Sequence, residues 1–151
     1  MTEPRLRRAR PDDVPAIQEL LSSESLPPFQ VSEFLDGFWT IEQDGRVAGC
    51  GGLEVYGEAG VIRSVVVDRS LRGRGFGDLL SQTAITAARR RGVKRLYLFT
   101  GDAASFWQRY GFARCTLDDF EPAAQESWQY KVMRMRPDIA VHLTPMRMEL
   151  T

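Results

Sequence analysis

The stretch VVVDRSLRGRGFGDLL, residues 65–80, joins a run of valines to an amphipathic segment through a loop rich in glycine and arginine. Valine runs are typical of strands, and the apolar residues that follow Phe76 recur at helical spacing. The stretch therefore predicts a strand, a loop and a helix in that order. The first turn of such a helix leaves backbone N–H groups without partners, and the helix dipole adds partial positive charge there. An anion is the expected ligand.

The glycines at positions 73, 75 and 77 favour a phosphate as that anion. A backbone without Cβ atoms can approach a bulky phosphate and can adopt positive φ where the loop folds back. Arg72 and Arg74 can add charge-assisted hydrogen bonds. The alternative interpretation is a glycine-rich turn with two solvated arginines. The strand before the loop and the helix after it favour phosphate binding.

Two common phosphate loops do not fit this spacing. A mononucleotide P-loop needs Lys followed by Ser or Thr after its last glycine, whereas Asp78 and Leu79 stand there. A dinucleotide fold has G-x-G-x-x-G after its first strand, whereas this loop reads G-x-G-x-G and follows the fourth predicted strand. Neither ligand class is favoured.

The rest of the chain predicts a mixed α/β sheet. Strands are expected at residues 5–9, 38–43, 46–57, 59–68, 94–100, 112–116 and 139–150, the last interrupted by Pro145. Helices are expected at residues 10–24, 76–92 and 102–111, and Pro122 leaves a further short helix open. Asp44-Gly45 marks a hairpin. This order implies one sheet with helices on both faces, in a single domain over residues 1–151.

Composition excludes several function classes. The formal net charge is zero, so no global field attracts nucleic acid or a membrane surface, and no apolar run is long enough to span a bilayer. The basic start has no apolar segment behind it, unlike a signal peptide. Cys50 and Cys115 lie far apart and are interpreted as reduced thiols. With a single histidine, His142, and no C-x-x-C pair, the sequence predicts no zinc site. We expect a cytoplasmic protein without a metal cofactor.

The loop and its surroundings resemble the GNAT superfamily of acyl-CoA-dependent N-acyltransferases. The family's pyrophosphate loop is similar to Arg72–Gly77, its preceding strand to Val65–Val67, and its later aromatic helix to Phe106–Phe112. The resemblance implies a mostly antiparallel sheet with a splayed central strand pair, and acetyl-CoA as cosubstrate. The cofactor-binding residues that it implies are Val65, Val66, Val67, Arg72, Gly73, Arg74, Gly75, Phe76, Gly77 and Phe106.

Narrower similarities concern the acceptor. FWTIEQDGRVAG, LYLFT and FWQRYGF look like amino-acid N-acetyltransferases of the glutamate type, and GGLEVYGEAGVIRSVVV looks like the arsenic-resistance N-acetyltransferases. Both groups acylate α-amino acids or analogues, which implies a small amine of that kind as the acceptor. Two alternatives stay open: a non-catalytic acyl-CoA-binding regulatory domain, and a protein N-terminal acetyltransferase.

Direct attack of an amine on a thioester needs a base, donors for the carbonyl oxygen and a proton for the leaving thiolate. Glu54 is the first candidate for the base and Glu58 the second; an exposed strand-end carboxylate is the alternative interpretation of Glu54. Trp107 stands where the superfamily has its tyrosine acid, so Tyr110, about one turn later, is the candidate acid, with a core aromatic as the alternative.

Arg63 is the candidate clamp for an acceptor carboxylate, because guanidinium matches carboxylate with two hydrogen bonds. A period of two places Arg63 on one apolar face with Val65, whereas the alternative is a surface charge. Thr100 is a second candidate for acceptor binding. The methionines Met133, Met135, Met146 and Met148 are interpreted either as core or as a homodimer contact.

Overall fold

The structure is a computed structural model that describes residues 2–150. Its strands are β1 (Arg5–Arg8), β2 (Phe38–Gln43), β3 (Arg46–Tyr56), β4 (Ala59–Val67), β5 (Arg95–Thr100), β6 (Ala113–Arg114) and β7 (Thr144–Glu149). Its α-helices are α1 (Val14–Ser23), α2 (Phe76–Arg90), α3 (Ala104–Gln108), α4 (Trp128–Met135) and α5 (Pro137–Ala140). Short 3₁₀ helices are η1 (Pro11–Asp13), η2 (Leu35–Gly37), η3 (Arg69–Leu71), η4 (Leu117–Asp119) and η5 (Ala124–Glu126).

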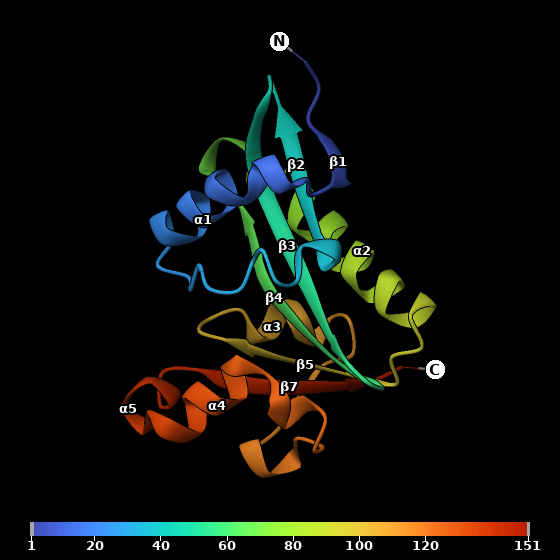
Figure 1. The fold of residues 1–151 in the computed structure, drawn as a ribbon, viewed down its shortest axis with the longest axis vertical. Helices are drawn as coiled ribbons and strands as arrows, with labels where there is room; N and C mark the ends of the chain where they lie inside the picture. Colours follow the sequence, from blue (N-terminus) through green and yellow to red (C-terminus); the bar gives the residue numbers. More distant parts are fainter. Residues whose placement is uncertain (1, 151) are drawn as a thin grey trace. The chain divides into compact units, whose positions relative to one another are not determined.

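The strands form a sheet in the order β1-β2-β3-β4-β5-β7-β6 (Figure 1). Four of its pairings, β1–β2, β2–β3, β5–β7 and β6–β7, are antiparallel, and β4–β5 is parallel. The parallel ladder joins Ala59–Val61 to Arg95–Tyr97, although β4 continues to Val67 and β5 to Thr100. The ladder thus ends before either strand does. These findings confirm the predicted mixed, mostly antiparallel sheet with a splayed central pair.

The chain divides into two compact units. The first comprises the residues up to Glu54 together with Ile62–Ala87, and the second comprises Val55–Val61 and the residues from Ala88 onward. The prediction of a single domain over residues 1–151 stays a prediction. None of the helices described between residues 2 and 150 has the length and apolar character needed to cross a bilayer.

In the first unit, α1 and α2 cover opposite faces of the strands (Figure 1). Ile17 and Leu21 of α1 pack against Phe38 and a cluster of strand residues that includes Cys50 and Val66. On the other face, a Cβ on Gly51 would lie 3.5 Å from Leu80 of α2. The predicted placement of helices on both faces is confirmed.

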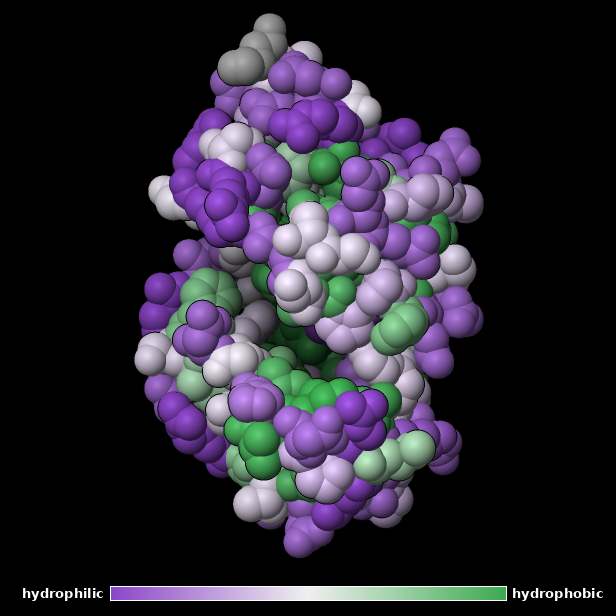
Figure 2. All heavy atoms as spheres, turned by 90° about the vertical axis from the view of Figure 1, so that its left-hand side faces the viewer, coloured by the Kyte–Doolittle hydropathy of each residue, from purple (hydrophilic) through white to green (hydrophobic). Residues whose placement is uncertain are grey.

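In the second unit, aromatic rings fill much of the core. Phe120 lies with its ring centroid 4.4 Å from Tyr97 of β5 and 5.4 Å from Tyr130 of α4. Met133, Met146 and Met148 are buried, which confirms core packing for these three methionines, whereas Met135 is 76% exposed. Figure 2 shows patches of hydrophobic side chains on the face of the molecule that it presents. A homodimer stays a prediction.

The C-terminal segment differs from the prediction. Residues 139–150 were expected to form one strand, but α5 (Pro137–Ala140) comes first and β7 begins at Thr144. Pro137 has the fixed φ that suits the first turn of a helix, which explains why the chain turns helical here. Pro145 is the second residue of β7, and its carbonyl accepts the N–H of Cys115 at 3.0 Å. Pro145 has no backbone N–H to donate, and the sheet tolerates this because the residue lies near the start of the strand.

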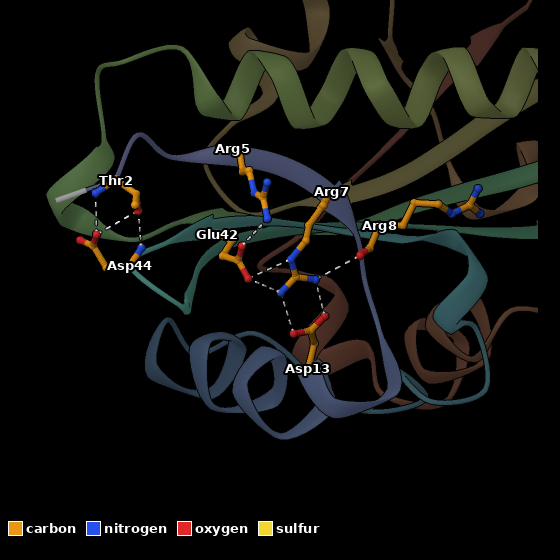
Figure 3. Close-up of polar contacts among 7 residues, drawn as sticks. All are labelled: Thr2, Arg5, Arg7, Arg8, Asp13, Glu42 and Asp44. Carbon is orange, nitrogen blue, oxygen red and sulfur yellow. Dashed lines mark hydrogen bonds and ion pairs between the residues drawn. The ribbon is translucent and has the colours of Figure 1, made fainter.

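An ion-pair network joins β1, β2 and the start of α1 (Figure 3). The Arg7 guanidinium donates to both carboxylate oxygens of Asp13, at 2.7 and 3.0 Å, and its Nε donates to Glu42 at 3.2 Å. Asp13 also accepts the backbone N–H of Arg10 at 2.7 Å, next to the start of η1. The hydrogen bonds from Arg7 are the main reason why the pKa values of Asp13 and Glu42 are lowered. The network fixes the entry to α1.

Replacement of Arg7 by glutamine should destabilise the protein in a pH-dependent way. Because the pKa of Asp13 is lowered in the fold, its contribution is present above the ordinary carboxyl value of about 4 and is lost as the pH falls through the lowered folded pKa. We expect Arg7→Gln to lower the free energy of unfolding by about 1.5–3 kcal/mol at pH 7. Urea unfolding at pH 7 and pH 3 measures this, and an equal loss at both pH values would contradict it.

Candidate active site

A single residue breaks the regularity of β4. Ser64 has φ +62°, a left-handed conformation that is uncommon for a residue other than glycine. Before it, the Arg63 guanidinium lies 5.5 Å from the centre of the Phe38 ring, on the α1 face. After it, Val65 lies 3.5 Å from a Cβ built on Gly51, on the α2 face. The prediction that Arg63 and Val65 share one face is therefore wrong, because the irregular backbone at Ser64 shifts the alternation by one residue.

Arg63 and Glu54 form a buried ion pair in the first unit. Arg63 Nη1 lies 3.1 Å from Glu54 Oε2, and the two side chains are 6% and 0% exposed. Neither side chain is a surface charge. The alternative interpretations, an exposed carboxylate for Glu54 and a surface charge for Arg63, are therefore wrong. Glu58, the second candidate base, is exposed at the turn between β3 and β4. The roles of Glu54 as base and of Arg63 as clamp stay predictions.

The loop between α1 and β2 supplies the other acceptors for Arg63. Nη1 donates to the carbonyl oxygen of Phe29 at 2.5 Å, and Nη2 donates to that of Pro27 at 3.0 Å. Nε donates to the hydroxyl of Ser64 at 2.8 Å. The sequence offered no signal for Pro27, Phe29 and Ser64 at this place, since two are backbone acceptors and the third depends on an irregular strand.

The glycine loop leads from β4 into α2, which begins at Phe76. Gly73 and Gly75 have φ +79° and +89°, so both need the left-handed region that glycine enters without cost. A Cβ added to Gly73, Gly75 or Gly77 would meet no protein atom within 4 Å. The space in front of the loop is open. The N–H groups of the first turn of α2 lie where the loop ends. This arrangement fits a phosphate group.

The two arginines of the loop have different surroundings. Arg72 pairs with Glu24, just beyond the end of α1, at 2.5 Å, and its Nε donates to the carbonyl oxygen of Val67 at 3.0 Å. Arg74 is exposed, with its guanidinium 5.7 Å from the centre of the Phe76 ring. Arg72 therefore ties the loop to α1 and to the end of β4. No pattern in the sequence points to Glu24 as the partner of Arg72, because the two residues lie 48 positions apart.

The remaining candidate residues lie in the second unit. Phe106 and Tyr110 are half-buried, with ring centroids 5.5 Å apart. Trp107 is 7% exposed and packs edge-on against Phe106. Thr100 is buried, and its hydroxyl accepts the N–H of Ala103 at 3.1 Å, just before α3. The roles of Phe106, Tyr110 and Thr100 stay predictions.

The cysteines are free thiols. Burial raises the pKa of Cys50 to about 12 and is the main cause that raises the pKa of Cys115 to about 11, so both hold their protons at neutral pH. Within residues 2–150, no three side chains of His, Cys, Asp or Glu gather as metal ligands would. The expectation of a protein without metal stays a prediction.

The structure defines a mixed α/β protein with an open glycine loop between β4 and α2. Residues 6–112 match the profile of the family described as Acetyltransferase (GNAT) family. The chain belongs to this family, which confirms the resemblance drawn from the sequence. The prediction of an N-acetyltransferase is confirmed with it.

Relatives add detail. The chain is 34% identical over 119 residues to an amino-acid acetyltransferase of Mycobacterium tuberculosis, covering 72% of this chain and 68% of the relative. It is 30% identical over 139 residues to an amino-acid acetyltransferase of Ralstonia nicotianae, covering 85% of this chain but only 31% of that longer protein. A crystal structure of a Mycobacterium tuberculosis protein in complex with CoA and NLQ has a TM-score of 0.78 and 26% identity, covering 98% of this chain and 100% of that chain.

Proposed function

We propose that this acetyltransferase moves the acetyl group of acetyl-CoA to the amine of an amino acid or an amino-acid analogue. The open, left-handed glycine turn in front of α2 is the observation that carries the CoA part of the proposal. The names of the relatives, amino-acid acetyltransferase, support the acceptor class. A cytoplasmic location, and the absence of nucleic acid and membrane partners, stay predictions.

The cosubstrate is held by backbone groups in this proposal. The N–H groups from Arg72 to Gly77 bind the pyrophosphate, and the backbone of Val65–Val67 binds the pantetheine arm as an added strand would. Phe106 is the proposed aromatic contact. The glycines fit this role because their missing Cβ atoms leave the approach free.

Acetyl-CoA supplies an activated acetyl thioester. Glu54 is the proposed base that accepts a proton from the acceptor ammonium, after which the amine nitrogen bonds to the acetyl carbon, the carbon–sulfur bond breaks and the nitrogen releases its second proton to solvent. Tyr110 is the proposed proton donor to the leaving thiolate. A thiol has a reference pKa of about 8.5, so the thiolate is also a tolerable leaving group without a dedicated acid. Arg63 and Thr100 are proposed to hold the acceptor.

Arg63→Lys tests the acceptor class. Lysine keeps the positive charge beside Glu54, so the buried carboxylate stays compensated, but it loses the two-pronged geometry. We expect KM for an amino acid to rise about ten- to a hundredfold, as for the loss of a charged hydrogen bond of about 1.5–3 kcal/mol. KM for the corresponding α-amide should change much less. The measurement is a paired kinetic assay of acid and amide on both proteins.

Two results would contradict this assignment. Equal effects of Arg63→Lys on acid and amide would remove Arg63 from the acceptor site. A wild-type preference for plain amines over amino acids would show that the acceptor class is wrong.

A further inference from the structure

Two backbone carbonyl oxygens accept hydrogen bonds from the Arg63 guanidinium, as the two oxygens of a carboxylate would. Phe29 O accepts from Nη1 at 2.5 Å and Pro27 O accepts from Nη2 at 3.0 Å. Guanidinium binds carboxylates with this same pair of terminal nitrogens. We propose that the segment Pro27–Phe29 is the resting occupant of the acceptor's carboxylate site, and that the acceptor binds by displacing it. This inference rests on the proposed function.

The guanidinium can stay in place during such an exchange. Its Nε remains bonded to the Ser64 hydroxyl, Nη1 keeps Glu54 at 3.1 Å, and the Phe38 ring supports it at 5.5 Å. These contacts come from β2, β3 and β4, whereas only the displaced contacts come from the loop. The site for the acceptor is therefore already built around Arg63.

A carboxylate should bind the Arg63 guanidinium more strongly than the two carbonyl groups do. Pro27 and Phe29 offer neutral carbonyl oxygens, whereas hydrogen bonds between two charged groups are shorter and roughly twice as strong. An acceptor with an α-carboxylate can therefore replace both carbonyls. An amine without a carboxylate offers no such exchange.

The segment has room to leave. On its side toward α1 lies a hollow of about 750 Å³, lined by Gln18, Glu19, Ser22, Pro28, Phe29, Gln30 and Glu33. The side chain of Phe29 is 62% exposed. The carbonyl of Pro28 accepts a long hydrogen bond of 3.3 Å from Gln18 Nε2. Movement of the segment therefore opens into solvent and not into packed protein.

The segment competes with any acceptor for Arg63, so the apparent affinity of the acceptor is its intrinsic affinity multiplied by the fraction of molecules in which the segment is released. Pro28 lies between the two carbonyl residues, and its fixed φ holds them in their bonded conformation. Pro28→Gly should favour release through the greater freedom of glycine. We expect KM for an amino acid to fall about two- to fivefold with kcat unchanged. If the loop only lined the acceptor site, the greater freedom of glycine would raise KM instead.

The experiment compares wild type, Pro28→Gly and Ser32→Gly. Ser32 is an exposed residue of the same loop whose carbonyl accepts from Leu35 and not from Arg63, so it is the matched control. The acceptors are the best substrate from a panel of the twenty amino acids and its α-amide. Hydrogen exchange of the backbone amides of Leu26 and of residues 29–34 is measured with and without each, since Pro27 and Pro28 have no backbone N–H.

We expect KM to fall in Pro28→Gly alone, and loop exchange in the wild type to become faster with the amino acid. A KM that rises or stays constant in Pro28→Gly overturns the inference, as does loop exchange that slows or does not change. If the enzyme acetylates amino acids and either of these occurs, the inference fails and the proposed function stands. If no amino acid of the panel is acetylated, the amino-acid part of the proposed acceptor class fails and the inference fails with it.

Discussion

Gly75→Glu should abolish the binding of acetyl-CoA to a protein that still folds. Gly75 has φ +89°, and a Cβ there points into open space in front of the loop. A glutamate would place both a side chain and a negative charge where the pyrophosphate is proposed to lie. Like charges brought together at an interface cost several kcal/mol, so affinity should fall by more than about a hundredfold. Isothermal titration of CoA measures the loss.

Gly45→Glu is the matched control for this substitution. Gly45 has φ +78°, and a Cβ there also meets no protein atom within 4 Å, but the residue lies in the turn between β2 and β3. Both variants carry the same kind of backbone strain and the same added charge. Gly45→Glu should bind CoA as the wild type does. If a folded Gly75→Glu variant also bound CoA normally, the glycine loop would not be the phosphate site.

Glu54→Gln should lower kcat by about a hundred- to ten-thousandfold, the range for loss of a general base. Glutamine has nearly the same shape and keeps an oxygen that can accept from Arg63, so the buried contact at 3.1 Å can persist. It cannot take a proton from an ammonium group. CoA affinity should be retained, since the proposed cosubstrate contacts are made elsewhere. Steady-state kinetics and CoA titration on the same samples provide the measurement.

Glu58→Gln is the control, because Glu58 is the second candidate base and is exposed at the β3–β4 turn. It should leave kcat unchanged. A normal kcat in Glu54→Gln together with a large loss in Glu58→Gln would exchange the two assignments. A loss of CoA affinity in Glu54→Gln would show instead that the buried pair supports the fold of the site, since breaking such a pair leaves an uncompensated charge.

Features that depend on neighbouring residues were predictable from the sequence. The valine run forms β4, the apolar spacing after Phe76 forms α2, and the glycines between them adopt positive φ. Asp44 and Gly45 have φ +52° and +78°, as their hairpin signal indicated. In each case the local chemistry of a few adjacent residues decides the conformation, and these elements were enough to indicate the family.

Tertiary structure decided the environment of Arg63. Its partners Pro27 and Phe29 lie 36 and 34 residues away, and two of its contacts are to carbonyl oxygens, which every residue type possesses. Its face of the sheet depends on Ser64, where a left-handed residue reverses the alternation that a period of two predicts. A period in the sequence gives the face of a regular strand, but an irregular residue and the loop that packs against it are fixed only by the folded chain.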